Sequence, residues 1–462
     1  MAVLVALLAT CFIFGGASRL DVFGLIFLQP LAVIFGAIIL LIPGQVHWSR
    51  VRVPMLILGL LAAAIAVQLL PLPPAIWTNL PGRAPYVDTA IVAGVAQPWR
   101  PISLTPDLTW GALVALVVPA AILVGIAAVS QRQVRQLLPF VIGGALISAL
   151  IGLIQITGGS DSPFYLYRIT NRGSAVGLFA NRNHQAFLLA AVFPMLALWA
   201  RSHVDDPRMR LARWVLAGVA ILFLIPVVLV TGSRGGLMLS CLGLIFALLI
   251  FGSFAYNLER GRVRKWLLLG VCGVAVGGGG VAATAVMVSR DEALQRLLTD
   301  AVSEDARASY LPTLLRMASE FFPVGSGFGS FDPVFRMYEP FETLEINYFN
   351  HAHNDALEML ITGGVAGGLV VAVFLFWLIY RTLHILINRT HTEGWAYALT
   401  GLGVIVLLLI GSLFDYPLRT PLLAAILAIA CAWAGIRTSE AERSEGSADP
   451  TKRLYGRRNH GY

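Results

Sequence analysis

The sequence predicts an all-α protein that crosses a membrane many times, and three observations support this prediction. Hydrophobic residues make up 57% of the 462-residue chain, whereas charged residues make up only 13%. Soluble domains contain roughly 25% charged residues, so the chain is too apolar for that class. Apolar runs of about twenty residues recur along the sequence, and most segments between them are short and rich in Lys and Arg. We therefore expect a polytopic membrane protein with about twelve transmembrane helices.

Each expected span is an apolar run that can cross about 30 Å of hydrocarbon as a helix. Charged residues, Pro or Gly lie between the runs and mark their ends. The first run is short for a bilayer but lacks the basic start of a secretory signal, so we interpret it as a weak span. From the N-terminus, the expected spans lie near 2–16, 23–43, 53–72, 110–129, 137–157, 184–200, 213–231, 236–254, 266–287, 356–380, 396–413 and 421–436.

The positive charges predict the orientation of these spans. Most of the 33 Lys and Arg residues lie on one side of the membrane if the N-terminus is cytoplasmic, as the positive-inside rule requires. The formal net charge of +8 is therefore a topology signature, and no nucleic-acid partner is needed to explain it. The inner segments are 44–52, 130–136, 201–212, 255–265, 381–395 and the tail from Arg437.

The chain divides into a transmembrane domain, residues 1–437, and a tail, residues 438–462. The tail is polar, charged and poor in large apolar residues, so we expect it to be disordered in the cytoplasm. Three long loops should face outward, at about 73–109, 158–183 and 288–355. Within the last loop, apolar residues at helical spacing predict two amphipathic helices that rest on the membrane or cap a cavity. These residues are Leu294, Leu297 and Leu298, and Leu311, Leu314 and Leu315.

The expected spans themselves contain little titratable chemistry. No Asp, Glu, Lys or Arg lies within 110–129, 137–157 or 396–413. Ion-coupled carriers usually place ionisable groups near the middle of the membrane, so this pattern argues against a proton or sodium relay. Polar residues gather instead where spans meet the outer surface.

The first such place is TGSRGG, residues 231–236, between two apolar runs with almost no loop. Arg234 must lie at the membrane boundary, where an unpaired guanidinium is costly and therefore a functional candidate. Gly235 and Gly236 would expose backbone N–H groups at a helix start, which together with Arg234 would suit a phosphate. The alternative is an interfacial arginine that reaches up to lipid headgroups.

The second place is HAHNDALEML, residues 351–360, in front of a long apolar run. Asn354 or Asp355 can cap the helix that follows, and Glu358 resembles the second member of a capping box. The positive end of that helix favours a neutral imidazole, which a general base requires. Two alternatives remain open: a metal site formed by His351, His353 and Asp355, or a structural cap with incidental histidines. No further His or Cys cluster completes a metal shell.

Two other stretches are less specific. In GLFANRNHQAFLL, residues 177–189, polar residues again lie directly at the start of a span. Its loop contains Arg168, Arg172 and Arg182. These arginines are either a cationic site or ordinary surface residues. FFPVGSGFGSF, residues 321–331, is a Gly-rich turn without the strand context of a nucleotide-binding loop.

Four motifs in order resemble the O-antigen ligase and O-antigen polymerase superfamily, bacterial membrane glycosyltransferases that share a Wzy-type C-terminal region. The resemblance implies a GT-C-like helical fold with an outward-facing cavity beneath a periplasmic loop, in the bacterial inner membrane. It also implies metal-independent, inverting transfer of a glycan from undecaprenyl diphosphate to a sugar acceptor, without a cofactor. The motifs are FANRNH (179–184), GSRGG (232–236), PVGSGFGSF (323–331) and HAHNDALEMLITGGVAG (351–367).

The resemblance assigns roles to particular residues. Arg234 and His353 match the arginine and histidine expected to be catalytic, and Arg172 or Arg182 matches a basic residue of the earlier periplasmic loop. A departure is Ala356, where an aromatic residue is frequent. The residues expected to bind substrate are Arg172, Arg182, Asn183, His351, Asn354 and Gly235.

The resemblance leaves the acceptor open. A ligase transfers the glycan to a lipid A core sugar, whereas a polymerase transfers it to another growing O-antigen or exopolysaccharide chain; a protein acceptor is a further alternative. A polysaccharide-lipid exporter or flippase belongs to another class, against which the charge-free spans argue.

Overall fold

The computed structural model describes residues 1–19, 21–202, 204, 206–255, 301–341, 349–388 and 392–436, and most of them are helical. The only strands in these ranges are β1 (Pro71–Leu72) and β2 (Arg100–Pro101), an antiparallel pair in which Pro71 lies opposite Pro101. Three predicted features lie outside the described residues: the span 266–287, the helix with Leu294 and the tail 438–462. The all-helical, polytopic prediction is confirmed for the part of the chain that is described.

Eight stretches of the described residues are helical, long and apolar enough to cross a membrane, and three shorter apolar helices accompany them. Each of these coincides with a predicted span, and the total of about twelve stays a prediction. The eight are α2 (Phe23–Leu41), α6 with α7 (Pro106–Ala115, Val117–Ala128), α8 with α9 (Gln131–Arg135, Leu137–Thr157), α10 (Arg182–Arg201), α11 (Pro207–Val230), α12 (Arg234–Ala255), α17 (Asp355–Ile387) and α18 (Glu393–Gly411). The shorter helices are α1 (Ala2–Phe14), α3 (Arg52–Val67) and α19 (Pro421–Ala434).

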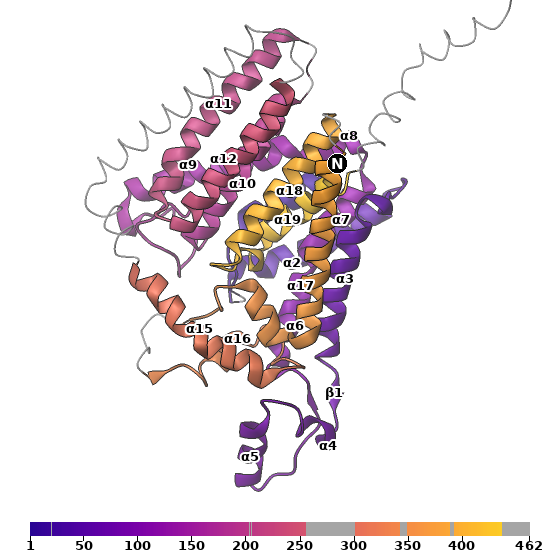
Figure 1. Ribbon diagram of the computed structural model, residues 1–462, viewed down its shortest axis with the longest axis vertical. Helices are drawn as coiled ribbons and strands as arrows, with labels where there is room; N and C mark the ends of the chain where they lie inside the picture. Colours follow the sequence, from indigo (N-terminus) through magenta and orange to yellow (C-terminus); the bar gives the residue numbers. More distant parts are fainter. Residues whose placement is uncertain are drawn as a thin grey trace, which may run out of the picture.

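The remaining helices are short or amphipathic and connect these spans. The predicted helix around Leu311 is confirmed as α15, in which Leu314 is buried while Leu311 and Leu315 are exposed. In Figure 1, α4, α5, α15 and α16 gather at one end of the molecule, called here the loop end, and the N-terminus and α8 lie at the opposite end. The elements are η1 (Trp48–Arg50), α4 (Pro74–Trp77), α5 (Ala84–Val92), η2 (Gly159–Asp161), α15 (Ala301–Phe321), α16 (Phe331–Phe335) and η4 (Pro417–Arg419).

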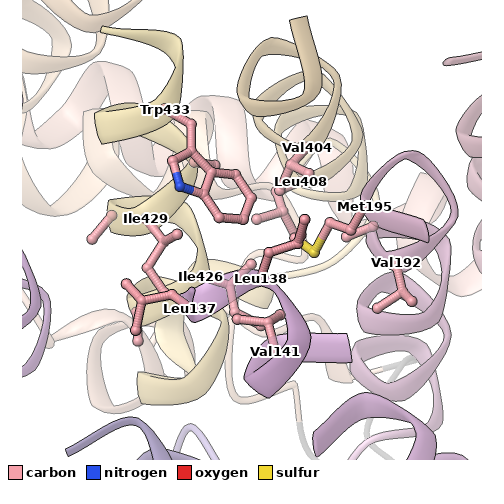
Figure 2. Packing of buried hydrophobic residues seen from close by; sticks show 14 of the residues in the cluster. Leu137, Leu138, Val141, Val192, Met195, Val404, Leu408, Ile426, Ile429 and Trp433 are labelled. Carbon is pink, nitrogen blue, oxygen red and sulfur yellow. The ribbon is translucent and has the colours of Figure 1, made fainter. Parts of the chain in front are cut away.

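The core lies where α9, α10, α18 and α19 meet, and Figure 2 shows their interdigitated side chains, among them Met195, Leu408 and Trp433. In the most apolar window of α10, 89% of residues are buried, against 22% in α2 and in α11. A helix that is apolar and buried all round lies at the centre of a bundle, whereas α2 and α11 present apolar side chains outward, as lipid-facing helices do. The motif at the start of α10 is therefore attached to the most buried of the eight candidate spans among the described residues.

Small residues bring α12 against α10. A Cβ placed on Gly236 would lie 2.2 Å from Cβ of Ala186, and one placed on Gly243 would lie 2.5 Å from the carbonyl oxygen of Ala190. Small residues at such a contact let two helix backbones approach closely within a membrane. The close approach holds the start of α12, with Arg234, beside the start of α10.

The Gly-rich turn 323–331 joins the end of α15 to an interruption in α17. Gly364 has φ +57° and ψ −140°, which breaks that helix. The backbone N–H of the next residue, Val365, donates to the carbonyl of Pro323 at 2.8 Å. Gln68 from the end of α3 donates to the carbonyls of Val324 and Thr362 at 3.1 and 2.9 Å. The residues after the break, 365–387, are long enough to cross a bilayer by themselves. The Gly-rich turn, called here the Gly-rich brace, therefore connects three segments that lie far apart in the sequence: the end of α3, the end of α15 and the interruption in α17.

Replacing Gly325 by Ala should destabilise the protein by more than the cost of a left-handed backbone alone. Gly325 has φ +81°, and a Cβ there would lie 2.3 Å from the carbonyl oxygen of Thr362. Gly94 is a matched control, because it has φ +66° with nothing within 4 Å of its Cβ position. Both variants incur the left-handed penalty of about 1–2 kcal/mol, and overpacking adds about 1–3 kcal/mol at Gly325. Thermal unfolding in detergent should show the lower midpoint for Gly325→Ala; equal midpoints would contradict the close contact.

Candidate active site

A cavity of about 480 Å³ lies at the loop end of the bundle, where four apolar helices start or stop. The starts of α10, α12 and α17 and the segment after α18 surround it, and α15 closes one side. The lining residues are Arg182, Asn183, Phe187, Gly232, Ser233, Arg234, Gly235, Met238, Leu311, Leu314, Ala352, His353, Asn354, Leu357, Leu413, Phe414 and Asp415. Three of the four sequence motifs thus contribute to one cavity, and the Gly-rich turn does not.

Arg234 is the first residue of α12 and follows a three-residue turn after α11. Gly232 makes this turn possible with φ +67°, and Ser233 caps the helix by accepting the N–H of Gly236 at 2.9 Å. Gly235 lines the cavity as expected, but the N–H of Gly236 is already used by Ser233. The positive end of α12 and the Arg234 side chain therefore face the same space.

Arg182 is the first residue of α10 and lies against the same turn. Asn181 caps α10 by accepting the N–H of Asn183 at 2.8 Å, and the side-chain oxygen of Asn171 accepts the N–H of Arg182 at 2.9 Å. A Cβ placed on Gly232 would lie 3.5 Å from Nη1 of Arg182. The two arginines thus reach the cavity from neighbouring helix starts.

Arg172 occupies a different position. Its Nη1 donates to the carbonyl of Ser160 at 2.9 Å, and its guanidinium carbon lies 5.6 Å from the centre of the Tyr165 ring. It is not among the cavity-lining residues. Of the two arginines that the sequence left open, the cavity geometry favours Arg182.

His353 has an unusual backbone and a carboxylate partner. With φ +48° it is the only residue other than glycine with positive φ among those described. Its Nδ1 lies 3.4 Å from Oδ1 of Asp415, and its ring packs against Phe349 and Tyr416 at centroid distances of 4.9 Å each. Left-handed backbone at a non-glycine residue is costly and tends to occur at functional sites. Because Asp415 faces Nδ1, a neutral His353 with its proton on Nδ1 would carry its basic lone pair on Nε2.

Asp415, which sequence reasoning missed, is the anion of this site. Its Oδ2 accepts the side-chain amide of Asn183 at 2.5 Å, and its Oδ1 accepts the N–H of Tyr416 at 2.9 Å. Burial by itself would raise the pKa of Asp415, but the nearby imidazoles of His184 and His353 hold that pKa well below its ordinary value. Asp415 is therefore ionised at neutral pH. The signal was available in DYPLR, residues 415–419, where charges occupy a short connection between two apolar runs, as in TGSRGG.

His351 belongs to a second group of residues behind the cavity. Its Nδ1 lies 3.1 Å from Oε1 of Glu358, whose other carboxylate oxygen accepts the N–H of Ala352 at 2.9 Å. Arg419 lies 3.2 Å from Glu358 and 3.3 Å from Asp355. This buried network fixes the loop before α17, and it places His351 outside the cavity lining.

Asn354 is the residue that caps α17, because its side-chain oxygen accepts the N–H of Leu357 at 3.0 Å. Glu358 turns to Ala352 and Arg419 instead of completing a capping box. Among the described residues, no group of three or more His, Cys, Asp and Glu side chains is arranged to hold a metal ion. His351, His353 and Asp355 each face a different partner, so they do not assemble into the metal site considered as an alternative.

A comparison with known protein families agrees with three of the four motifs. Residues 219–372 match the sequence profile of the family Wzy_C, described as O-antigen ligase. The matched region contains the turn with Arg234, the Gly-rich brace and the loop with His353, whereas Arg182 and Asp415 lie outside it. A search of curated proteins with the chain gives no match. Residues 219–372 therefore carry a Wzy_C domain, which supports the resemblance to the O-antigen ligase and O-antigen polymerase superfamily.

Proposed function

We propose that the protein is an O-antigen ligase-like glycosyltransferase, which moves a glycan from undecaprenyl diphosphate to a sugar of the lipid A core. The reaction would take place at the periplasmic face of the bacterial inner membrane. The Wzy_C domain supports ligase-type or polymerase-type chemistry on lipid-linked glycans in general. The observation that most supports this proposal is the single cavity that receives Arg182, Arg234 and His353 from three different helix starts.

The cavity suits a lipid diphosphate because it is cationic on one side and apolar on the other. Arg182, Arg234 and the positive end of α12 offer hydrogen-bond donors and charge for the two phosphates. Met238 and Leu311 contribute the apolar side and are 49% and 47% exposed, so they can contact a polyprenyl tail. Charge that develops on the departing diphosphate would thus be neutralised by guanidinium groups.

His353 suits the role of general base for the acceptor. The acceptor hydroxyl would give its proton to Nε2 of His353 as its oxygen attacks the anomeric carbon, and the bond from that carbon to the phosphate oxygen would break with its electrons moving to the diphosphate. Asp415, 3.4 Å from Nδ1, would stabilise the imidazolium that forms. A single displacement inverts the anomeric configuration. Asp415 is the one carboxylate among the lining residues and is already hydrogen-bonded, which argues against a double displacement by a carboxylate pair.

Glycan transfer by the purified full-length protein in detergent tests the proposal. The protein would be given an undecaprenyl diphosphate-linked glycan together with lipid A core, and the expected products are glycosylated core and free undecaprenyl diphosphate. Elongation of the lipid-linked glycan in place of core glycosylation would identify a polymerase. Absence of any transfer, combined with movement of the lipid-linked glycan across the bilayer in proteoliposomes, would overturn the proposal in favour of an exporter.

The transfer reaction should be insensitive to chelation. We expect the rate in excess EDTA to stay within about twofold of the untreated rate, because arginines and not a divalent ion neutralise the diphosphate in this mechanism. A loss of activity that added Mg²⁺ or Mn²⁺ restores would show that a metal ion performs this role.

Replacing Asp415 by Asn should lower the transfer rate by about 10²–10⁴-fold. The amide is nearly isosteric but removes the charge that stabilises the His353 imidazolium. Asp332→Asn is a matched control, since Asp332 is paired with Arg336 on α16 and is not among the cavity-lining residues. The initial rates of both variants, with thermal unfolding as a check of folding, decide the role; a wild-type rate for Asp415→Asn would remove Asp415 from the mechanism.

A further inference from the structure

Asp415 lies between two imidazoles, and the mechanism above uses only one of them. His184, in the first turn of α10, places Nε2 at 3.7 Å from Oδ1 of Asp415, the same oxygen that faces Nδ1 of His353 at 3.4 Å. The His184 side chain is 1% exposed, and its Nε2 has no hydrogen-bond partner within 3.5 Å among the described residues. His184 is not a lining residue of the cavity, so it cannot touch a substrate there.

The charge of Asp415 requires compensation close by. Its side chain is 1% exposed, and a buried anion surrounded only by neutral donors is strongly unfavourable. The donors to Oδ2 are the neutral side-chain amides of Asn183 at 2.5 Å and Asn181 at 3.4 Å. The two groups near Oδ1 that can hold a positive charge are the imidazoles of His184 and His353.

A general base must be neutral before it accepts a proton, so His353 cannot hold this charge in the reactive state. We propose that His184 holds the compensating proton, as an imidazolium that keeps Asp415 ionised while His353 stays neutral. His184 is thus a positioning residue that acts on the reaction through Asp415. This inference rests on the proposed role of His353 as the base.

Other charged groups lie around the site, and they are the same in the wild type and in a His184 variant. Arg182 and Arg234 line the cavity, from α10 and α12. Asp355 and Glu358 on α17, His351 in the preceding loop and Arg419 in η4 form the network behind it, where both carboxylates already have Arg419 as a partner. A difference between wild type and variant therefore reports the charge of His184.

The test is the pH dependence of kcat/KM for wild type and His184→Gln in the full-length protein. Gln offers a neutral donor near the position of Nε2 but cannot hold the proton, so the compensating proton should move to His353. We expect the acid limb to shift upward by about one pH unit, which is about a tenfold loss at pH values on that limb, with recovery to within about twofold at alkaline pH. His384→Gln, in the half of α17 remote from the cavity, should leave the profile unchanged. An unmoved acid limb, or an equal loss at every pH, would overturn the inference.

A second measurement needs no activity. In the ¹⁵N spectrum of histidine-labelled wild-type protein at pH 7, assigned with His184→Gln and His353→Gln, His184 should be protonated on both nitrogens and His353 on one. A neutral His184 would refute the inference. Absence of transfer by the wild type at all pH values would instead refute the proposed function, and the spectrum would still decide the charge of His184.

Discussion

Glycan transfer falls by about 10²–10⁴-fold when His353 is replaced by Asn, if His353 is the general base. Asn tolerates left-handed backbone better than most residues, so the loop before α17 can keep the φ of +48° that His353 adopts. The loss would then reflect the missing imidazole and not a rearranged loop. Single-turnover rates at saturating donor and acceptor measure this effect on chemistry.

The binding of donor provides the control for this variant. Affinity for undecaprenyl diphosphate should stay within a few-fold of wild type, because the guanidinium groups of Arg182 and Arg234 remain. A His353→Asn protein that transfers glycan at nearly the wild-type rate would exclude His353 as the base.

Replacing Arg234 by Ala should lower kcat/KM by about 10²–10³-fold, because the leaving diphosphate loses a bidentate, charged donor at the start of α12. Arg234→Lys keeps the charge but lacks the planar guanidinium, so its kcat/KM should lie between that of Arg234→Ala and that of the wild type. Steady-state kinetics with a lipid-linked donor measure the order of the three proteins. A wild-type value for Arg234→Ala would show that the diphosphate binds elsewhere.

Three other arginines give that experiment its controls. Arg336→Ala removes an exposed guanidinium on the surface of the loop end, where it pairs with Asp332, and should be close to wild type. Arg182→Ala should reduce kcat/KM more than Arg172→Ala, because only Arg182 lines the cavity. The reverse order would return the diphosphate contact to the earlier loop.

The positions of the helices were predictable because lipid leaves the backbone few options. Every peptide group in hydrocarbon must be paired within its own segment, so apolar runs such as 137–157 and 396–413 become helices. These correspond closely to α9 (Leu137–Thr157) and α18 (Glu393–Gly411). The gathering of TGSRGG and HAHND at one rim also followed from sequence, since charge is costly in the span interiors.

The pairing of residues across the site was not predictable, because it depends on contacts between segments far apart in the chain. Asp415 lies more than sixty residues after His353 and more than two hundred after Asn183, and only the packed bundle brings the three together. The same limit applies to Gln68, which crosses from α3 to the Gly-rich turn. His351 looked equivalent to His353 in sequence, yet Glu358 and Arg419 draw it behind the cavity. A spacing of two residues cannot distinguish these two environments.

An experimental structure with undecaprenyl diphosphate bound would test the proposed mechanism most directly. The diphosphate oxygens should lie within hydrogen-bond distance of the guanidinium groups of Arg182 and Arg234, with the tail passing Met238 and Leu311 and with Nε2 of His353 facing the place of the anomeric carbon. A diphosphate bound outside this cavity, in contact with neither arginine, would contradict it.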